Sequence, residues 1–503
     1  MSLGFNLAQI FTDNMVLQKD VKVPIWGEAP SDSNIVVEIH GQVKETLAVN
    51  GKWFVLLSPL KSGGPYELNV TCDNSSIIIR NILVGEVWVA GGQSNMEFNL
   101  QKSLKGREYI SGANYPNIRY YDVPKIEYED GLHSEDSATQ NSWLICTPEN
   151  AGKFSAVAYH FAVDLYENLD VPIGIIGCNW GGTSASCWMS TECLAEHEDL
   201  KAYLDEYNEQ ISTLSNEVYE KQRITNNLEI EEYNAKCDKF RLENPGIEED
   251  VVASSVEGYP WPPPMGPKCF LRPSGLYNTM LKKIIPYEVK GVLWYQGETD
   301  AEKPTLYRKL FSTMIGNWRN DWKNPELPFL FVQLPAYAAE NPLGDDWALL
   351  RESQLHVMKN LNKTFMVVSI DCGEKDNIHP VNKKPIGERL AILALSEIYR
   401  QKSESTGPIY NRMDIDGNKI ILYFNHMGRG LSVKGVSLRG FEICGSNKRF
   451  VPAKAEIINN TVVVYSDEIN CPYVVRYGWS NYPDINLYNI EGLPASPFRT
   501  DSL

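Results

Sequence analysis

The sequence predicts an α/β protein whose parallel sheet is flanked by β-rich parts at both ends of the chain. Between residues 86 and 404, apolar strand-like runs recur, and helical patterns separate several of them. Such alternation gives a parallel sheet with helices on both faces. Before residue 85 and after residue 405, short runs alternate apolar and polar residues between turn clusters, which is typical of a β-sandwich. We therefore expect domains at 1–85, 86–404 and 405–503.

The individual elements follow from the period of the apolar residues. Strands are expected at 21–27, 34–41, 52–57 and 66–72, then at 87–90, 171–177, 289–295, 327–334 and 364–370, and finally at 419–424, 461–466 and 473–477. Helical patterns lie at 155–169, 307–322 and 347–360. The polar stretch 192–244 predicts a helical hairpin within an insertion at about 191–285, and the proline-rich stretch 260–267 predicts a rigid loop that folds over the site.

The composition of the chain limits which binding partners we expect. The formal net charge of the 503 residues is −17, so a phosphate backbone would be repelled and nucleic acid is not expected to bind. Because apolar runs stay shorter than 18 residues, we expect no membrane partner. The ten cysteines and seven histidines lack zinc-site spacing, so we expect neither metal nor cofactor. We expect a secreted or periplasmic protein whose signal peptide is absent from this chain, and its oligomeric state stays open.

Ser94 is the first candidate for chemistry. The run 87–90 reads as a buried strand, Gly91 and Gly92 end it, and Ser94 follows at once. A hydroxyl on a tight glycine turn after a buried strand is a common way to present a nucleophile, and glycine lets the backbone turn sharply. An ordinary Gly-Ser turn would explain the same residues, because Met96 stands where the G-x-S-x-G elbow has its last glycine.

A serine nucleophile needs a base, and the base needs an orienting group. Of the seven histidines, His379 follows the last predicted strand of the sheet, with Asp376 three residues earlier. A loop carrying Asp-x-x-His can hold the carboxylate near the imidazole and fix its tautomer. A plain polar turn is the alternative explanation, and His133 is a weaker candidate for the base.

Acyl transfer also needs donors for the developing oxyanion. The backbone N–H groups of Ser94 and of Gly181 or Gly182 are candidates, and the Gln296 amide is a third. Each could equally serve in an ordinary turn or loop. However, the carboxyl ends of parallel strands meet at one edge of a sheet, so we expect these segments to gather there. Candidate substrate-binding residues are Gln93, Asn95, Glu298 and Arg351.

Several segments carry a resemblance to a known family. They are Gly92-Gln-Ser94-Asn-Met96, Trp180-Gly-Gly-Thr183, Trp294-Tyr-Gln-Gly-Glu298 and Asp376-x-x-His379-Pro380, with Asn14-Met-Val-Leu-Gln18, Tyr477-Gly-Trp479 and Gly492-Leu-Pro-Ala-Ser-Pro-Phe498 outside the core. Together they resemble the sialate O-acetylesterases, which belong to the SGNH-type serine esterases. The resemblance covers nearly the whole chain and implies a flavodoxin-like core that deacetylates sugar hydroxyls. One residue departs from the broad SGNH pattern, which has Asn where this chain has Gln296.

The resemblance implies that Ser94 is the nucleophile, His379 the base and Asp376 its partner. We therefore expect a metal-independent serine esterase that removes O-acetyl groups from carbohydrate through an acetyl-enzyme, with O-acetylated sialic acid as the first substrate. A rival interpretation is an acetylesterase of acetylxylan or another plant glycan. A second rival, from another class, is a noncatalytic carbohydrate-binding protein, suggested by the β-rich parts and the many aromatic residues.

Overall fold

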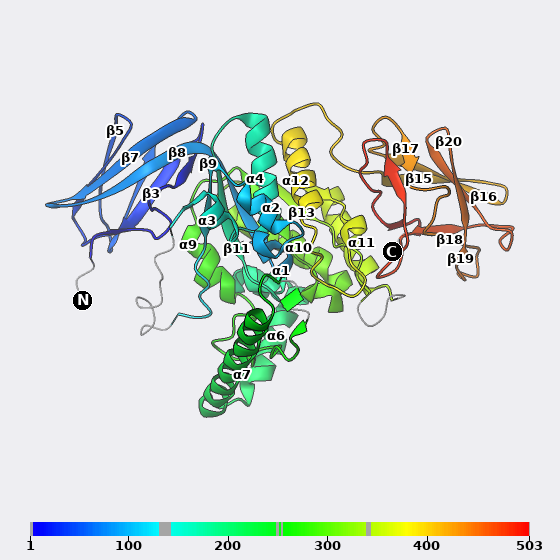
Figure 1. Cartoon of the computed structure of the whole chain (residues 1–503), viewed down its shortest axis with the longest axis horizontal. Coiled ribbons are helices and arrows are strands. Elements are labelled where there is room, and N and C mark those ends of the chain that lie inside the picture. Colours follow the sequence, from blue (N-terminus) through cyan, green and yellow to red (C-terminus); the bar gives the residue numbers. More distant parts are fainter. Residues whose placement is uncertain (1–3, 130–141, 248–250, 253–254, 339–343, 502–503) are drawn as a thin grey trace. The chain divides into compact units, whose positions relative to one another are not determined.

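The chain folds into two units, shown together in Figure 1. The computed structural model describes residues 4–129, 142–247, 251–252, 255–338 and 344–501. The first unit comprises 1–293 and 313–327, and the second comprises 294–312 and 328–503. Strand β12 (Gly291–Tyr295) and helix α10 (Pro304–Asp321) each run from one unit into the other.

The first unit begins with small antiparallel sheets, as the alternating pattern predicts. Strands β1 (Asn6–Leu7), β3 (Val23–Glu28) and β6 (Lys52–Leu57) form one sheet. Strand β4 (Asn34–Ile39) pairs with β5 (Gln42–Leu47) and β7 (Gly63–Cys72). In β6, Trp53, Val55 and Leu57 are buried and the residues between them are exposed, so the period-two pattern corresponds to one buried face.

Strand β8 (Ser75–Gly92) joins this β-rich part to the core. Its first half pairs antiparallel with β7, and its last seven residues pair parallel with β11 (Ile173–Asn179). The short strand β2 (Val16–Gln18) lies parallel to it. Gln18 fixes this junction, because its amide donates to the Glu86 carboxylate at 2.8 Å and accepts the Val87 N–H at 2.8 Å. β8 thus crosses residue 85 without a break, and the division into three domains stays a proposal.

The core sheet of the first unit contains the expected parallel strands. Its order is β10-β9-β11-β8, followed by β12. β11 is parallel to both β8 and β9 (Tyr115–Asp122), while the edge strand β10 (Leu144–Cys146) is antiparallel to β9. Helix α4 (Ala156–Leu169) packs on β11 and β9. β9 was not predicted, because its polar residues hide a strand in which residues 118–121 are buried. The short helices are α1 (Ser94–Glu97), η1 (Leu100–Lys102), α2 (Gly106–Ser111) and α3 (Pro148–Ala151).

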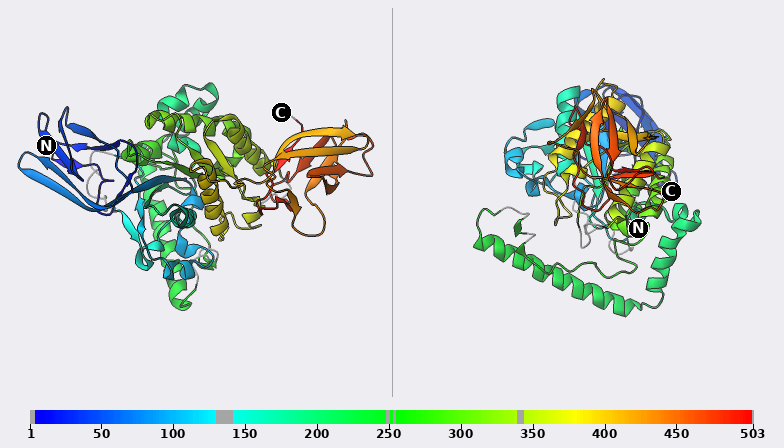
Figure 2. Two further views of the ribbon diagram at one scale, coloured as in Figure 1. Left: turned by 90° about the horizontal axis from the view of Figure 1, so that it is seen from above. Right: turned by 90° about the vertical axis from the view of Figure 1, so that its right-hand side faces the viewer.

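The predicted helical insertion contains α5 (Thr191–Ala195), α6 (Glu198–Ser212) and α7 (Asn216–Glu243). It is preceded by η2 (Ala185–Trp188) and followed by η3 (Tyr277–Leu281) and α9 (Lys282–Ile284). The expected hairpin is wrong in one respect: α6 and α7 diverge instead of lying side by side (Figure 2, right). The 28 residues of α7 bury only Tyr219, Asn226 and Cys237, so the helix has no apolar stripe wide enough to pack along α6.

The second unit carries the other core strands. β12 is followed in the sheet by β13 (Phe329–Val332) and β14 (Thr364–Val367), and β13 is parallel to β14. Helices α11 (Asp346–Asn360) and α12 (Lys384–Glu397) pack on β14, and α12 also packs on β13. Short 3₁₀ turns, η4 (Thr299–Glu302) and η5 (Ile370–Cys372), follow β12 and β14.

The C-terminal part of the second unit is a β-sandwich. One sheet contains β15 (Ile409–Asp416), β16 (Lys419–Asn425), β21 (Thr461–Tyr465) and β20 (Lys454–Ile458); the other contains β19 (Val451–Pro452), β18 (Phe441–Cys444), β22 (Val474–Tyr477) and β24 (Phe498–Arg499). A separate pair is formed by β17 (Leu431–Val433) and β23 (Leu487–Asn489). Side chains of both sheets, such as Leu422 and Val475, share one buried cluster.

Candidate active site

Ser94 lies at the point where β8 becomes α1. Gly92 has a φ of 134°, which only glycine adopts readily, and Ser94 is the first helical residue. The carbonyl of Gln93 accepts the N–H groups of Met96 and Glu97, each at 2.9 Å. Gln93 and Asn95 are buried, whereas Ser94 is partly exposed. The main chain itself therefore holds the hydroxyl at the end of the strand.

The Trp180-Gly181-Gly182 turn after β11 packs directly on Ser94. The Trp180 N–H donates to the Gly92 carbonyl at 3.1 Å. A Cβ on Gly181 would lie 3.3 Å from the Ser94 Cβ and 3.3 Å from the Glu97 carboxylate. The Gly181 N–H donates to Glu97 Oε2 at 2.6 Å, so this candidate oxyanion donor is occupied by a carboxylate here. Gly182 has a φ of 72°, and a Cβ there would overlap the Trp261 ring.

A small charge network surrounds Glu97. Its other oxygen pairs with the Lys125 ammonium, which lies 5.6 Å from the centroid of the Trp180 ring. Asp122, at the end of β9, shares this ammonium: burial raises the pKa of the Asp122 carboxyl to about 6, and Lys125 opposes that shift. Two carboxylates thus face one cation beside the serine turn. Glu97 and Lys125 were not predicted from the sequence, because nothing local signals a pair 28 residues apart.

Aromatic side chains extend from this turn. The Trp180 ring stacks on Phe270, with centroids 4.5 Å apart and an interplanar angle of 11°. Trp261 lies against the same Phe270 at 6.4 Å. These rings give the first unit an apolar platform next to Ser94, of the kind that can pack on a sugar ring.

In the second unit, Asp376 and His379 lie on one loop that follows β14 and η5. Glu374 organises this loop: its carboxylate accepts the Asn377 amide at 3.0 Å and the Val381 N–H at 2.9 Å. Asn377 in turn accepts the His379 backbone N–H at 3.0 Å. His379 is partly exposed and Asp376 is exposed. Within the described part of the chain, the Asp376 carboxylate has neither a hydrogen-bond partner nor a cation, so its role as the orienter of His379 stays a prediction.

Gln296 and Glu298 follow β12 in the same unit. Gln296 is fully buried, and its amide donates to Asp300 at 2.6 Å while its oxygen accepts the Tyr307 hydroxyl at 3.0 Å. These contacts fix the orientation of the amide. Its use as an oxyanion donor stays a prediction.

Lys383 connects Glu298 to the histidine loop electrostatically. Its side chain is buried, 5.7 Å from the centroid of the Tyr295 ring. Burial lowers the pKa of the Lys383 ammonium to about 7, although the carboxylates of Glu298 and Glu374 oppose the shift. Lys383 was not predicted from the sequence, because a single lysine before a helix carries no sign that it will be buried.

Arg351 lies in the protein interior and donates hydrogen bonds to main-chain carbonyls. It is fully buried in α11, and its guanidinium donates to the carbonyls of Pro335 at 3.3 Å, Asn481 at 3.4 Å and Ser480. Burial lowers its pKa to about 9. These contacts occupy the guanidinium, and its predicted use in substrate binding stays a prediction. The alternative base His133 lies outside the described residues.

Comparisons with known proteins identify the family. A family model described as "carbohydrate esterase, sialic acid-specific acetylesterase" matches residues 265–396. The sialate O-acetylesterase of Rattus norvegicus is 27% identical over 542 residues, covering 99% of this chain and 94% of that protein. The sialate O-acetylesterase of Homo sapiens is 27% identical over 544 residues, covering 99% of this chain and 92% of that protein. A solved carbohydrate acetylesterase from Xanthomonas citri is 34% identical with a TM-score of 0.80, covering 99% of this chain and 100% of that chain. The chain belongs to the sialate O-acetylesterase family.

Membership in the sialate O-acetylesterase family makes this protein an esterase that acts as a carbohydrate acetylesterase. It also confirms the predicted fold class, a sheet with parallel strands and helices that is flanked by β structure at both ends. Over the residues described, the structure contains no group of three or more His, Cys, Asp or Glu side chains placed to hold a metal ion. In the same residues, no helix is both long and apolar enough to span a membrane.

Proposed function

We propose that this esterase removes O-acetyl groups from carbohydrate by a serine mechanism, with O-acetylated sialic acid as substrate. The observation that carries the proposal is the Ser94 turn: a partly exposed hydroxyl follows a buried strand on a glycine turn, and Gly181 packs against it without a side chain. Such a turn leaves room for an acetyl carbonyl to approach Oγ.

The proposed reaction has two halves. Ser94 Oγ attacks the acetyl carbonyl while His379 takes the serine proton, and His379 then returns that proton to the sugar oxygen as it leaves. Water, deprotonated by His379, releases acetate from the acetyl-enzyme. Asp376 is the proposed partner that stabilises the imidazolium. Its exposed carboxylate moves toward the ring when substrate binds, as catalytic hydrogen bonds often tighten in that complex.

For the oxyanion, we propose the N–H groups of Ser94 and of Gly181 or Gly182, together with the Gln296 amide. The Gly181 N–H already donates to a negatively charged oxygen, that of Glu97. This contact supports the proposal that the turn favours an anion, and substrate would have to displace Glu97 to use the same donor. Gln93, Asn95 and Glu298 stay proposed contacts to substrate.

One observation favours the alternative of a neutral acetylated glycan, such as acetylxylan. Sialic acid carries a carboxylate, which a protein usually meets with Arg or Lys. In the described part of the first unit, the Lys125 ammonium beside the serine turn already pairs with Glu97, and the nearby Trp180 ring carries no charge. The curated mammalian relatives are named as sialate O-acetylesterases, which favours the sialic acid substrate.

The deciding experiment measures acetate release by the wild type from O-acetylated sialic acid and from acetylated xylan. Hydrolysis of 4-nitrophenyl acetate serves as the general test of esterase activity, and the Ser94→Ala variant serves as the blank. A higher kcat/KM on O-acetylated sialic acid supports sialic acid as the substrate. A higher kcat/KM on acetylated xylan supports the neutral glycan. If Ser94→Ala still hydrolyses 4-nitrophenyl acetate at the wild-type rate, the serine mechanism is wrong.

A further inference from the structure

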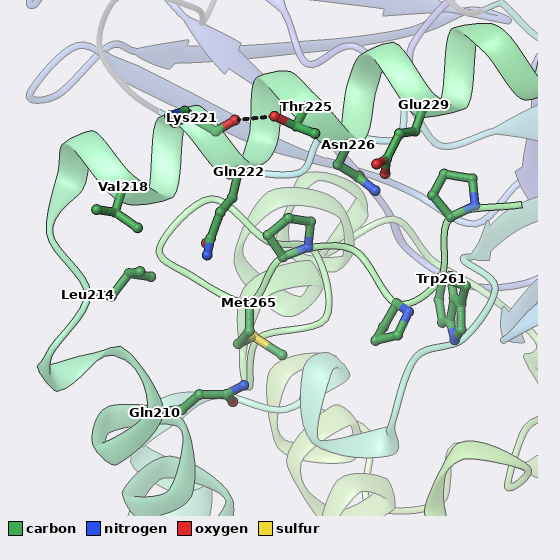
Figure 3. A pocket seen from close by; sticks show the side chains of 13 residues that line it. Gln210, Leu214, Val218, Lys221, Gln222, Thr225, Asn226, Glu229, Trp261 and Met265 are labelled. Carbon is green, nitrogen blue, oxygen red and sulfur yellow. Dashed lines mark hydrogen bonds between the residues drawn. The ribbon is translucent and has the colours of Figure 1, made fainter.

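The divergence of α6 and α7 opens a groove in the first unit. A cavity of about 880 Å³ lies between the end of α6, the first half of α7 and the proline-rich loop that contains Trp261 (Figure 3). Its size falls within the range of about 300–1,000 Å³ that is usual for sites of small ligands. All of its lining residues belong to the first unit.

The polar side chains of the groove carry hydrogen-bonding groups but no net charge. Gln210, Gln222, Thr225 and Asn226 line it, and Figure 3 shows Gln210 and Gln222 pointing into the space between the helices and the loop. Amides both donate and accept hydrogen bonds, as sugar hydroxyls do. The charged lining residues, Lys221 and Glu229, have opposite signs. This chemistry suits an uncharged polyol and does not suit an anion.

The opposite wall is aromatic and stiff. Trp261 is 50% exposed, and it stands in a loop whose prolines 260, 262 and 264 also line the groove. Proline restricts the backbone, so the loop that carries the indole is stiff before any ligand arrives. An indole face packs well on the C–H face of a sugar ring, and the half-exposed Val218 on α7 adds apolar surface.

The groove shares a wall with the proposed catalytic turn. The Trp261 ring fills the space that a side chain on Gly182 would need, and a Cβ on the neighbouring Gly181 would lie 3.3 Å from the Ser94 Cβ. A chain of sugars in the groove can therefore run past Trp261 toward the serine.

We propose that this groove binds the uncharged sugars that are linked to the acetylated sugar, so that the enzyme selects acetylated oligosaccharides over acetylated monosaccharides. The inference rests on the proposed carbohydrate esterase function and adds a binding site for the rest of the chain. The amides bind the hydroxyls of these sugars, and Trp261 stacks on one ring. Either a xylan chain or the neutral sugars of a sialylated glycan could supply this chemistry.

The test compares matched long and short substrates. We would measure kcat/KM for acetylated xylotetraose against acetylated xylose, and for O-acetylated sialyllactose against O-acetylated sialic acid. The variants are Gln222→Ala alone and Gln222→Ala with Asn226→Ala. Asn227→Ala is the matched control, because Asn227 is an exposed amide on the same helix that does not line the groove. Hydrolysis of 4-nitrophenyl acetate monitors the serine chemistry independently of the groove.

We expect the double variant to lose roughly 5- to 30-fold in kcat/KM on the oligosaccharide of the preferred pair, mainly through KM, as for the loss of two hydrogen bonds. The single variant should lose part of this, while the monosaccharides, 4-nitrophenyl acetate and the Asn227→Ala control stay within about twofold of the wild type. The preferred pair is the one on which the wild type has the higher kcat/KM. It shows whether xylan or a sialylated glycan supplies the chain of sugars.

Two results would overturn the inference: equal kcat/KM for the long and short members of both pairs, or unchanged oligosaccharide kinetics in the double variant. Absence of wild-type activity on 4-nitrophenyl acetate would instead count against the proposed function. Calorimetric binding of unacetylated xylotetraose and lactose then tests the groove separately. Binding that Gln222→Ala weakens supports the groove, and no binding of either sugar rejects it.

Discussion

The turn at Ser94 and the loop at His379 are built by opposite means. In the first unit, main-chain hydrogen bonds and the glycines at 92, 181 and 182 hold the serine. In the second unit, side chains hold the histidine: Glu374 and Asn377 bind three backbone or amide N–H groups of their own loop. The difference predicts different sensitivities. Substitutions that add atoms at the turn should lower activity or stability. At the loop, substitutions that remove side-chain oxygens should lower activity.

The largest effect is expected when either region loses its reacting group. Ser94→Ala should lower kcat by roughly 10³-fold or more, and His379→Ala nearly as much, because the two act as one unit. Steady-state kinetics on 4-nitrophenyl acetate would measure both. The double variant should lose little more than either single variant. Losses that multiply would show that the two residues work independently.

The turn should respond to added atoms. Gly181→Ala places a methyl group 3.3 Å from the Ser94 Cβ, which shifts the serine by a few tenths of an ångström. We expect about a 10-fold fall in kcat/KM, with little change in the melting temperature.

Gly182→Ala is the contrasting variant. Its φ of 72° and the overlap with Trp261 should lower the free energy of unfolding by at least about 1–2 kcal/mol, the cost of left-handed backbone alone. Denaturant unfolding would measure this. Equal stability of the two alanine variants would contradict the packing described for the turn.

The histidine loop should be sensitive to the loss of the side-chain oxygens that bind its N–H groups. Glu374→Ala removes the acceptor for Asn377 and Val381, so we expect roughly a 10- to 100-fold fall in kcat/KM as His379 loses its position. Faster hydrogen exchange at 374–381 would accompany it, and Glu374→Gln, which keeps one oxygen, should recover part of the activity.

Asp376→Asn tests the proposed triad in the same loop. It should lower kcat by less than the roughly 10⁴-fold of the reference triad, because the carboxylate is exposed and water can partly replace it. The fold should be unaffected, as circular dichroism would show. Unchanged kcat at every pH would remove Asp376 from the mechanism.

Lys383 gives a smaller, pH-dependent effect in the second unit. Its folded pKa is lowered to about 7, whereas an unfolded lysine titrates near 10.4. Between these values the unfolded chain binds more protons, so this group makes stability rise with pH; below about 7 both states are protonated and the contribution is flat. Lys383→Met should remove that rise, measured as the difference in urea unfolding between pH 6.5 and pH 9. An identical pH dependence in the variant would contradict the burial of a titrating lysine.

The smallest expected effect is that of chelation. A mechanism run by the serine turn and the histidine loop needs no metal, so dialysis against EDTA should leave kcat within about twofold of its starting value. Metal analysis of the dialysed enzyme is the control. Loss of activity that a divalent ion restores would contradict the proposed mechanism.

The sequence by itself determined the elements whose signals are local. The apolar run 87–90 ended by two glycines predicted a strand that stops just before Ser94, and the structure ends β8 at Gly92. The alternation of strands and helices predicted the parallel sheet, and the motif segments predicted the family. These features can be read from the sequence because apolar residues recur with the period of the strand or helix that they belong to.

Only the tertiary structure decided how distant residues meet. Gly181 packs on Ser94 from 87 positions away, Lys125 reaches Glu97, and Arg351, predicted to bind substrate, is buried among carbonyl groups. The groove beside α7 exists because two helices diverge where a hairpin was expected. Such contacts depend on packing between elements, and a periodic pattern shows that a face is buried without showing what covers it.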